Sequence, residues 1–258
     1  MTLHMERRGS GRPLLLVHGL GGSVRSWDTI APALAAGREL VVIDLPGHGQ
    51  SPAIAGRQTI EACADAIESF IHEQGLAGVD LVGSSVGARL VLELSRRGVG
   101  GHCVALDPGG FWQGWEIPFF HWTLAASIRL LRLLEPVLPF VSRHAFTRTL
   151  LLIQLSARPW ALPAAVVLTE LRSFVATPVF DAMLRELAHG PLQPGTASPR
   201  GRVTIGWGRN DRLLVPRQGA RAQAAFPTAR LHWFDHCGHF PHWDQPDETV
   251  RVIMETCA

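Results

Sequence analysis

The sequence of 258 residues contains neither lysine nor tyrosine, so its 24 basic residues are all arginines. Without a lysine amine, Schiff-base chemistry, a Ser-Lys dyad and a P-loop lysine are excluded, and without a phenol so is proton transfer by tyrosine. Serine, cysteine, histidine, aspartate, glutamate and arginine are left for catalysis. Any anionic group on a ligand must therefore be met by arginine or by backbone amides.

Several other features are also missing. The net charge is only +2 and no long block of like charge occurs, so we expect a small-molecule partner and no nucleic acid. The first residues lack the apolar region of a secretory signal. The four cysteines form no C-x-x-C pair, which predicts reduced thiols in a cytoplasmic protein and no disulfide; they are Cys63, Cys103, Cys237 and Cys257.

Short apolar runs alternate with helical patterns over the first part of the chain. The runs at 14–17, 40–43, 79–82 and 103–106 are each stopped by a turn signal and predict buried strands. Apolar residues at helical spacing between them predict helices over 26–36, 60–72 and 86–97. This alternation predicts an α/β fold, with a mostly parallel central sheet and helices on both faces.

The alternation stops after residue 109. Residues 110–199 contain only helical patterns punctuated by prolines, and strand patterns resume at 202–207 and 230–234. The expected domains are thus a core, residues 1–109 and 200–258, and an inserted helical cap, residues 110–199. Charges such as Arg129, Arg132 and Glu135 interrupt the apolar stretches of the cap, so no membrane span is expected.

The first chemical signal is Gly83-Ser84-Ser85-Val86-Gly87, which lies directly between a predicted strand and a predicted helix. A serine in such a tight turn needs small neighbours and projects its hydroxyl free of the sheet edge. G-x-S-x-G alone is a weak pattern, but the strand-turn-helix context is the one that supports it. Ser85 is therefore the expected nucleophile.

A serine hydroxyl needs a base to accept its proton, and that base needs a carboxylate to orient it. Among twelve histidines, His239 lies on a turn after the last predicted strand, from which it can reach the carboxyl end of the sheet. Asp211, just after the preceding strand, is the favoured carboxylate. Asp107 also ends a strand and remains an alternative acid.

With these residues the chain resembles the α/β-hydrolase superfamily, specifically its small serine esterases with a helical cap. His18–Gly22 resembles the family's oxyanion loop, Asp44–Ser51 its D-x-x-G-x-G-x-S segment, and Gly238–Pro241 its histidine turn. The resemblance implies that the backbone amides of Leu20 and Val86 form the oxyanion hole. It also implies a cap that is inserted after the sixth strand and covers the pocket.

Other histidines and a cysteine suggest alternatives. His18 and His48 are expected to hold turn geometry through backbone hydrogen bonds rather than to act in catalysis. A zinc site is weighed for a cluster near the last turn, but the spacing lacks a second ligand group; the cluster is His236, Cys237, His239, His242 and Asp244. We expect no metal and no cofactor.

The expected activity is hydrolysis, through an acyl-enzyme, of carboxylic esters with small to medium, mainly apolar acyl groups. Four aromatic residues of the cap are the candidate substrate contacts: Trp112, Trp115, Phe119 and Trp122. The alternatives are a carbon–carbon bond hydrolase of the meta-cleavage-product type, perhydrolysis by the same residues, and a non-catalytic ligand-binding relative. The sequence defines neither the acyl and alcohol groups nor the oligomeric state.

Overall fold

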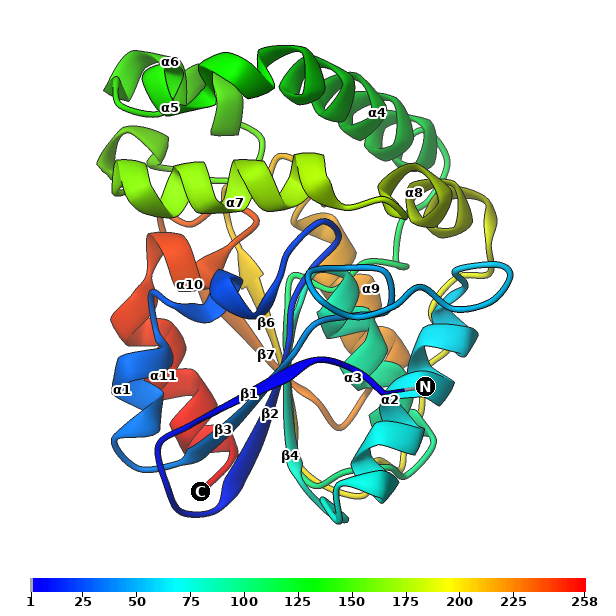
Figure 1. Ribbon diagram of the computed structural model, residues 1–258. Coiled ribbons are helices and arrows are strands. Elements are labelled where there is room, and N and C mark those ends of the chain that lie inside the picture. Colours follow the sequence, from blue (N-terminus) through cyan, green and yellow to red (C-terminus); the bar gives the residue numbers. More distant parts are fainter. Residues whose placement is uncertain (1) are drawn as a thin grey trace.

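A computed structural model describes residues 2–258 and contains one seven-stranded sheet (Figure 1). Its strands lie in the order β1-β3-β2-β4-β5-β6-β7. All neighbouring pairs are parallel except β1 and β3, which are antiparallel. The strands are β1 Met5–Arg8, β2 Pro13–Val17, β3 Glu39–Ile43, β4 Asp80–Ser84, β5 Cys103–Leu106, β6 Val203–Gly208 and β7 Arg230–Phe234. The predicted α/β class and mostly parallel sheet are confirmed.

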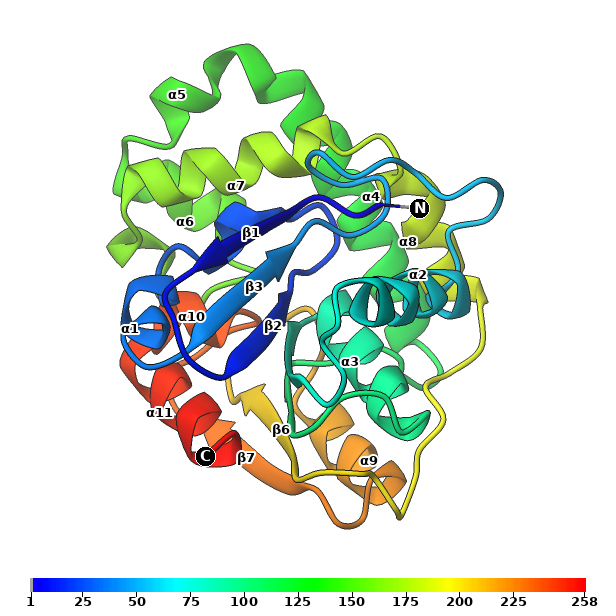
Figure 2. The ribbon, with the colours of Figure 1, turned by 60° about the horizontal axis from the view of Figure 1, so that its bottom comes forward.

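Two layers of helices cover the sheet because successive strand residues point to opposite faces. In β2, Leu14 and Leu16 pack with α1 and α11, whereas Leu15 and Val17 belong to the core cluster on the side of α2 and α3. The core helices are η1 Val24–Trp27, α1 Ala31–Ala35, α2 Ile60–Glu73, α3 Val86–Arg96, α9 Arg217–Ala225, α10 Pro241–Asp244 and α11 Pro246–Thr256. Figure 2 shows the same two layers from a second direction.

Two core elements differ from the sequence prediction. Strand β1 has the sequence Met-Glu-Arg-Arg, and its polar composition at the edge of the sheet gave no apolar run to detect. The single helix expected over 26–36 is instead η1 followed by α1, with Pro32 in the first turn of α1. Proline is tolerated in a first helical turn but not in a helix interior, which explains the break.

The inserted segment between β5 and β6 contains helices and loops but, among the described residues, no strand. Its elements are α4 Glu116–Leu134, η2 Glu135–Val137, α5 Leu138–Val141, α6 Ala145–Leu152, η3 Pro159–Ala161, α7 Ala164–Ala176 and α8 Phe180–His189. Five strands, β1 to β5, precede the cap in the sequence, and β6 follows it. The cap is therefore inserted after the fifth strand of this chain and not after the sixth, as had been expected. In Figure 1 the cap lies over the carboxyl ends of the parallel strands, with α7 between α4–α6 and the sheet.

Charged contacts tie the start of the cap to the core. Buried Glu116, at the start of α4, accepts hydrogen bonds from the guanidinium groups of Arg217 and Arg221 on α9. These bonds hold the pKa of Glu116 at about 2, although burial opposes that shift. Within residues 2–258, no helix has both the length and the apolarity that crossing a membrane requires.

Candidate active site

Ser85 lies in the turn between β4 and α3 with φ 56° and ψ −112°, a strained conformation for a residue with a side chain. The flanking glycines make this turn possible. A Cβ atom at Gly83 would lie 2.2 Å from the carbonyl oxygen of Gly87, and one at Gly87 would lie 2.1 Å from that of Val17. The backbone N–H of Ser85 donates to Leu106 on β5, which fixes the turn at the sheet edge.

His239 and Asp211 converge on this serine from two other loops. His239 Nε2 is 2.9 Å from Ser85 Oγ, and His239 Nδ1 is 2.8 Å from Asp211 Oδ2. A carboxylate can only accept, so Nδ1 carries the proton and Nε2 is free to accept the serine O–H. The structure thus brings together the three residues that the sequence analysis selected, in a serine-histidine-aspartate chain of hydrogen bonds.

Asp211 has its other oxygen fixed as well. Its Oδ1 accepts from the backbone N–H groups of Leu213 and Leu214, at 2.8 and 2.9 Å, so the carboxylate cannot rotate freely. The alternative acid, Asp107, is fully buried beside it and accepts from the Gly208 N–H. Burial, together with the charge of Asp211, raises the pKa of Asp107 well above its usual range. Asp107 therefore lies beside the acid of the observed chain, and His239 Nδ1 faces Asp211.

The turn that carries His239 is held by a carboxylate that the sequence analysis weighed only as a metal ligand. Asp244 accepts from Gly238 N–H, from Ser156 Oγ–H and from Ala157 N–H, at 2.8, 2.5 and 2.7 Å. It therefore joins the histidine turn to the cap segment between α6 and η3.

The zinc alternative finds little support in these contacts. Within residues 2–258, the one group whose possible ligand atoms all lie within 4.8 Å of one another is Asp107, Asp211 and His239. Only His239 belongs to the cluster weighed from the sequence, and both of its ring nitrogens already have partners. Burial lowers the pKa of His242 to about 3, and it raises the pKa of the Cys237 thiol far above its usual range.

The loop expected to supply the oxyanion hole is covered by helix α7 of the cap. Ser173 on α7 donates its hydroxyl to Gly21 O at 2.7 Å, and Ser26 Oγ donates to Glu170 Oε2 at 3.1 Å. Glu170 is fully buried, and burial raises its pKa to about 7. Leu20, in this loop, lines the cavity beside Ser85.

The other expected oxyanion donor is Val86. It begins α3, so its N–H is one of the helix-terminal amides that have no partner within the helix. Such amides carry the positive end of the helix dipole and favour a negative charge nearby. The position suits the role that the resemblance implies.

Two turn histidines, His18 and His48, make the backbone contacts that were expected of them. His18 Nε2 accepts from the Leu45 N–H while Nδ1 faces the Gly19 carbonyl, and His48 Nδ1 faces the Pro46 carbonyl. Burial lowers the pKa of His18 to about 4 and that of His48 to about 3, so both stay neutral.

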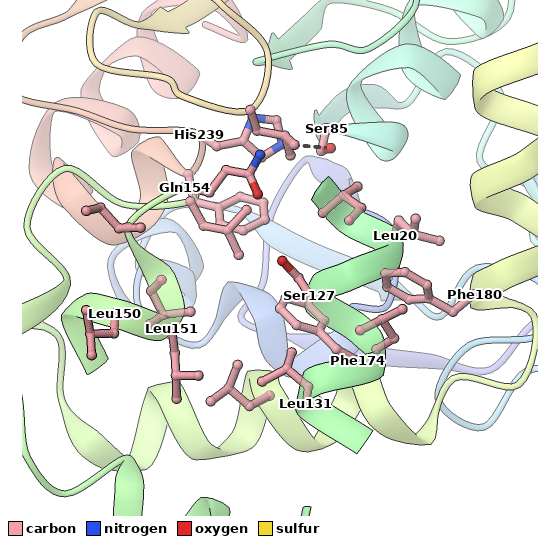
Figure 3. Close-up of a pocket in the computed structure, with 18 residues that line it drawn as sticks. Leu20, Ser85, Ser127, Leu131, Leu150, Leu151, Gln154, Phe174, Phe180 and His239 are labelled. Carbon is pink, nitrogen blue, oxygen red and sulfur yellow. Dashed lines mark hydrogen bonds between the residues drawn. The ribbon is translucent and has the colours of Figure 1, made fainter. Parts of the chain in front are cut away.

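A cavity of about 160 Å³ opens above Ser85 and His239, between the core loops and the cap (Figure 3). Among the described residues that line it, none is an arginine, aspartate or glutamate. The lining is Leu20, Ser85, Leu124, Ser127, Ile128, Leu131, Leu150, Leu151, Leu152, Ile153, Gln154, Leu155, Leu171, Phe174, Phe180, Leu213, His239 and Phe240. The cavity is therefore apolar with a few uncharged polar groups.

None of the four aromatic residues expected to touch substrate is among the described residues that line this cavity. Trp112 is buried and stacks on Phe120, and Trp115 is exposed beneath the Arg217 guanidinium. Phe119 meets Trp115 edge to face, and Trp122 is 64% exposed. The opposite face of α4, with Leu124, Ile128 and Leu131, lines the cavity instead, because the position of a helix face depends on packing that spacing does not reveal.

A doubly covered, mostly parallel sheet with a serine elbow at the carboxyl end of β4 and a helical cap defines an α/β hydrolase. The family model described as "Alpha/beta hydrolase family" matches residues 14–252. The chain therefore belongs to the α/β hydrolase family.

Individual proteins of known sequence or structure share only low sequence identity with this chain. The chain is 25% identical to a 2-hydroxy-6-oxo-6-phenylhexa-2,4-dienoate hydrolase of Burkholderia cepacia, over 99% of this chain and 91% of that protein. Among solved structures, a thermophilic esterase from Thermogutta terrifontis matches with a TM-score of 0.78 and 21% identity, covering 98% of this chain and 92% of that one. An enol-lactonase from Burkholderia xenovorans LB400 also gives 0.78, with 19% identity and 99% and 96% coverage. At these identities the structural matches show the shared fold.

Proposed function

We propose that this hydrolase cleaves uncharged carboxylic esters with small to medium, mainly apolar acyl groups through an acyl-enzyme on Ser85. The observation that carries the proposal is the hydrogen-bonded chain of Ser85, His239 and Asp211 at the floor of an uncharged apolar cavity. The nucleophile has a base at 2.9 Å, and the base has a fixed carboxylate at 2.8 Å.

The proposed reaction has two halves. Ser85 Oγ attacks the ester carbonyl carbon while His239 Nε2 takes the serine proton, and the carbonyl oxygen becomes an oxyanion facing the amides of Leu20 and Val86. His239 then gives its proton to the departing alcohol, which leaves an acyl-serine. In the second half His239 activates a water, which releases the acid and restores the serine. Asp211 holds the imidazole in the tautomer that both halves need.

The apolar lining supports the proposed substrate class. A charged group placed in this cavity would lose its hydration and meet no opposite charge from the lining, which is unfavourable by several kcal/mol. An acyl chain would gain about 0.8 kcal/mol for each methylene group that it buries. An uncharged ester with an apolar acyl group therefore fits the cavity best.

The second candidate is carbon–carbon bond hydrolysis, which the similarity to the phenylhexadienoate hydrolase favours. The name of that relative describes a carboxylate-bearing substrate, and such an anion needs arginine or backbone donors in a chain without lysine. The lack of an arginine among the described cavity residues disfavours this candidate. The sequence Gly87-Ala88 also differs from the two glycines common in hydrolases of that type.

The test compares p-nitrophenyl esters of graded acyl length with a dienone acid of the meta-cleavage type. We expect ester turnover that rises with acyl length until the cavity is filled, and no loss of the dienone chromophore. Ser85→Ala should remove ester turnover while the circular dichroism spectrum is retained. Ser84→Ala is the matched control, because Ser84 is the neighbouring buried serine and lies outside the hydrogen-bonded chain. Ester turnover by Ser85→Ala at the wild-type rate would refute the proposal, and dienone cleavage would favour the second candidate.

A further inference from the structure

The outer surface of the cap gathers most of the large apolar side chains that the described part of the chain leaves exposed. Eleven such residues are exposed, and eight lie on or just after α4, η2, α5 and α6. We call these eight the outer cap face: Trp122, Leu130, Leu133, Val137, Phe140, Phe146, Leu150 and Ile153. Single exposed apolar residues are ordinary, but a gathered set marks an interaction surface.

The spacing of these residues places them on continuous stripes. On α4 and η2, Leu130, Leu133 and Val137 follow one another by three and four residues, which is one helix face. On α6 and the turn after it, Phe146, Leu150 and Ile153 have the spacing four and three. Leu133 is 80% exposed and Phe146 is 74% exposed, so these side chains do not serve the packing of the chain.

The opposite sides of the same helices are apolar too. Ile128 and Leu131 of α4 and Leu152 of α6 are buried and line the cavity. A cap helix that only covered a core would present polar residues to water. Helices that are apolar on both sides fit a position between the protein interior and a second apolar medium.

The outer cap face is continuous with the cavity. Leu150 is 60% exposed and Ile153 is 47% exposed, and both also line the cavity above Ser85. In Figure 1, α4, α5 and α6 are the layer furthest from the sheet, with α7 beneath them. Figure 3 shows Leu150 and Leu151 at the α6 side of the cavity. An apolar molecule could pass from this surface into the cavity along apolar side chains.

The arginines near the outer cap face indicate which apolar medium it contacts. Residues 129–158 contain five arginines and one acidic residue, Glu135. Of these arginines, Arg132 pairs with Asp181 of α8, and Arg148 is buried and donates to backbone carbonyls. Arg129, Arg143 and Arg158 are exposed. Exposed arginines beside leucine, phenylalanine and tryptophan suit a bilayer with anionic headgroups, because guanidinium groups bind phosphates while apolar side chains enter the acyl boundary. A second copy of the chain would instead bring like charges together.

We propose that the outer cap face docks on the surface of an anionic lipid bilayer and receives apolar esters from it. The face lies in the plane of the interface, in keeping with the absence of a membrane-spanning helix among residues 2–258. Delivery of an ester to Ser85 rests on the proposed function, whereas docking does not. The two are therefore tested separately.

The docking test is flotation of the purified protein with vesicles of phosphatidylglycerol or of phosphatidylcholine. We expect binding to phosphatidylglycerol vesicles, weaker binding to phosphatidylcholine, and loss of binding at high salt. The double variant Leu133→Ser/Phe146→Ser should bind at least tenfold more weakly. Leu192→Ser is the matched control, because Leu192 is 50% exposed but lies outside the outer cap face, and it should bind like the wild type.

The charge and catalytic contributions need two further variants. Arg129→Glu/Arg143→Glu should weaken binding to phosphatidylglycerol vesicles roughly tenfold or more. Ser85→Ala should bind vesicles as strongly as the wild type. Docking can therefore be measured even if the protein does not hydrolyse esters. The serine and glutamate double variants should hydrolyse a short water-soluble ester at the wild-type rate, because the altered side chains lie outside the cavity lining.

Three results would overturn the docking proposal. They are the absence of wild-type binding to phosphatidylglycerol vesicles, equal binding by Leu133→Ser/Phe146→Ser, and a concentration-dependent dimer that this variant abolishes without any vesicle binding. The last result would assign the outer cap face to contact between copies of the chain.

Discussion

The loops at the carboxyl ends of the parallel strands, called the sheet edge below, meet the cap at the same cavity. The two regions are held by different kinds of contact. At the sheet edge, Asp211 and Asp244 each accept three hydrogen bonds, and the serine turn depends on glycines with no room for a Cβ atom. The inner face of the cap instead presents leucine, isoleucine and phenylalanine side chains to the cavity. The contacts around Asp211 and Asp244 depend on which donor is present and on the direction of each hydrogen bond. The contacts of the cap depend on the volume and apolarity of its side chains.

This difference suggests that the sheet edge determines the rate of the chemical reaction and that the cap determines substrate preference. A hydrogen bond to a buried charged group needs a particular partner at a particular angle, so changing one group leaves another unsatisfied. Apolar packing tolerates exchange among residues of similar volume. We therefore expect substitutions at the sheet edge to change the rate of reaction most, and substitutions in the cap to change substrate preference, lipid docking or stability.

The largest expected effect is at the acid of the hydrogen-bonded chain. Asp211→Asn should lower kcat by about three to four orders of magnitude, because the amide favours the wrong imidazole tautomer. Asp107→Asn should lower it by less than about tenfold, since His239 Nδ1 faces Asp211 while Asp107 accepts from the Gly208 N–H, a bond that an asparagine oxygen can also accept. Steady-state kinetics with a p-nitrophenyl ester measures both. The reverse ranking would make Asp107 the working acid.

Asp244 tests whether one carboxylate holds the histidine turn to the cap. Asp244→Ala leaves the donors of Gly238, Ser156 and Ala157 without this acceptor and should lower the free energy of unfolding by about 3 kcal/mol or more. Urea unfolding followed by tryptophan fluorescence gives the value. A loss below about 1 kcal/mol would mean that water replaces the carboxylate readily.

Glu170 tests the contact between α7 and Ser26 of η1. Its pKa is raised from 4.5 to about 7, so the folded chain keeps a proton that the unfolded chain loses above pH 4.5. This stabilising contribution is complete below pH 4.5 and is lost as pH rises through 7, a total of about 3 kcal/mol. Unfolding of wild type and Glu170→Gln should differ in this pH dependence. Parallel curves for the two proteins would show that Glu170 does not titrate in this range.

The smallest effect is expected on the outer side of the cap. Leu133→Ser should change the free energy of unfolding by no more than about 0.5 kcal/mol, because this side chain is 80% exposed. The inner-face substitution Ile128→Ala should lower it by about 2 kcal/mol or more, because Ile128 is buried. The same urea titration compares them. Equal losses would contradict the assignment of the two faces of α4.

The sequence predicted the residues at the sheet edge better than the orientation of the cap helices. The structure places Ser85, Asp211 and His239 next to one another. The glycine-flanked turn had pointed to Ser85, and the turns after the last two predicted strands to Asp211 and His239. The cavity-facing side of α4 was missed, since this helix is apolar on both sides and periodicity alone cannot orient it. Strand β1 was missed because an edge strand needs no apolar run. The role of Asp244 depends on donors from the distant cap, which local sequence does not reveal.

The most direct test of the central claim is labelling of the wild-type protein with a fluorophosphonate, followed by peptide mass spectrometry. The phosphonyl group should appear on Ser85, since only a serine with an adjacent base attacks phosphorus readily. Labelling should vanish in Ser85→Ala and fall strongly in His239→Ala, with Ser84 unmodified in each protein. Labelling at another serine, or none in the folded wild type, would contradict a nucleophilic role for Ser85.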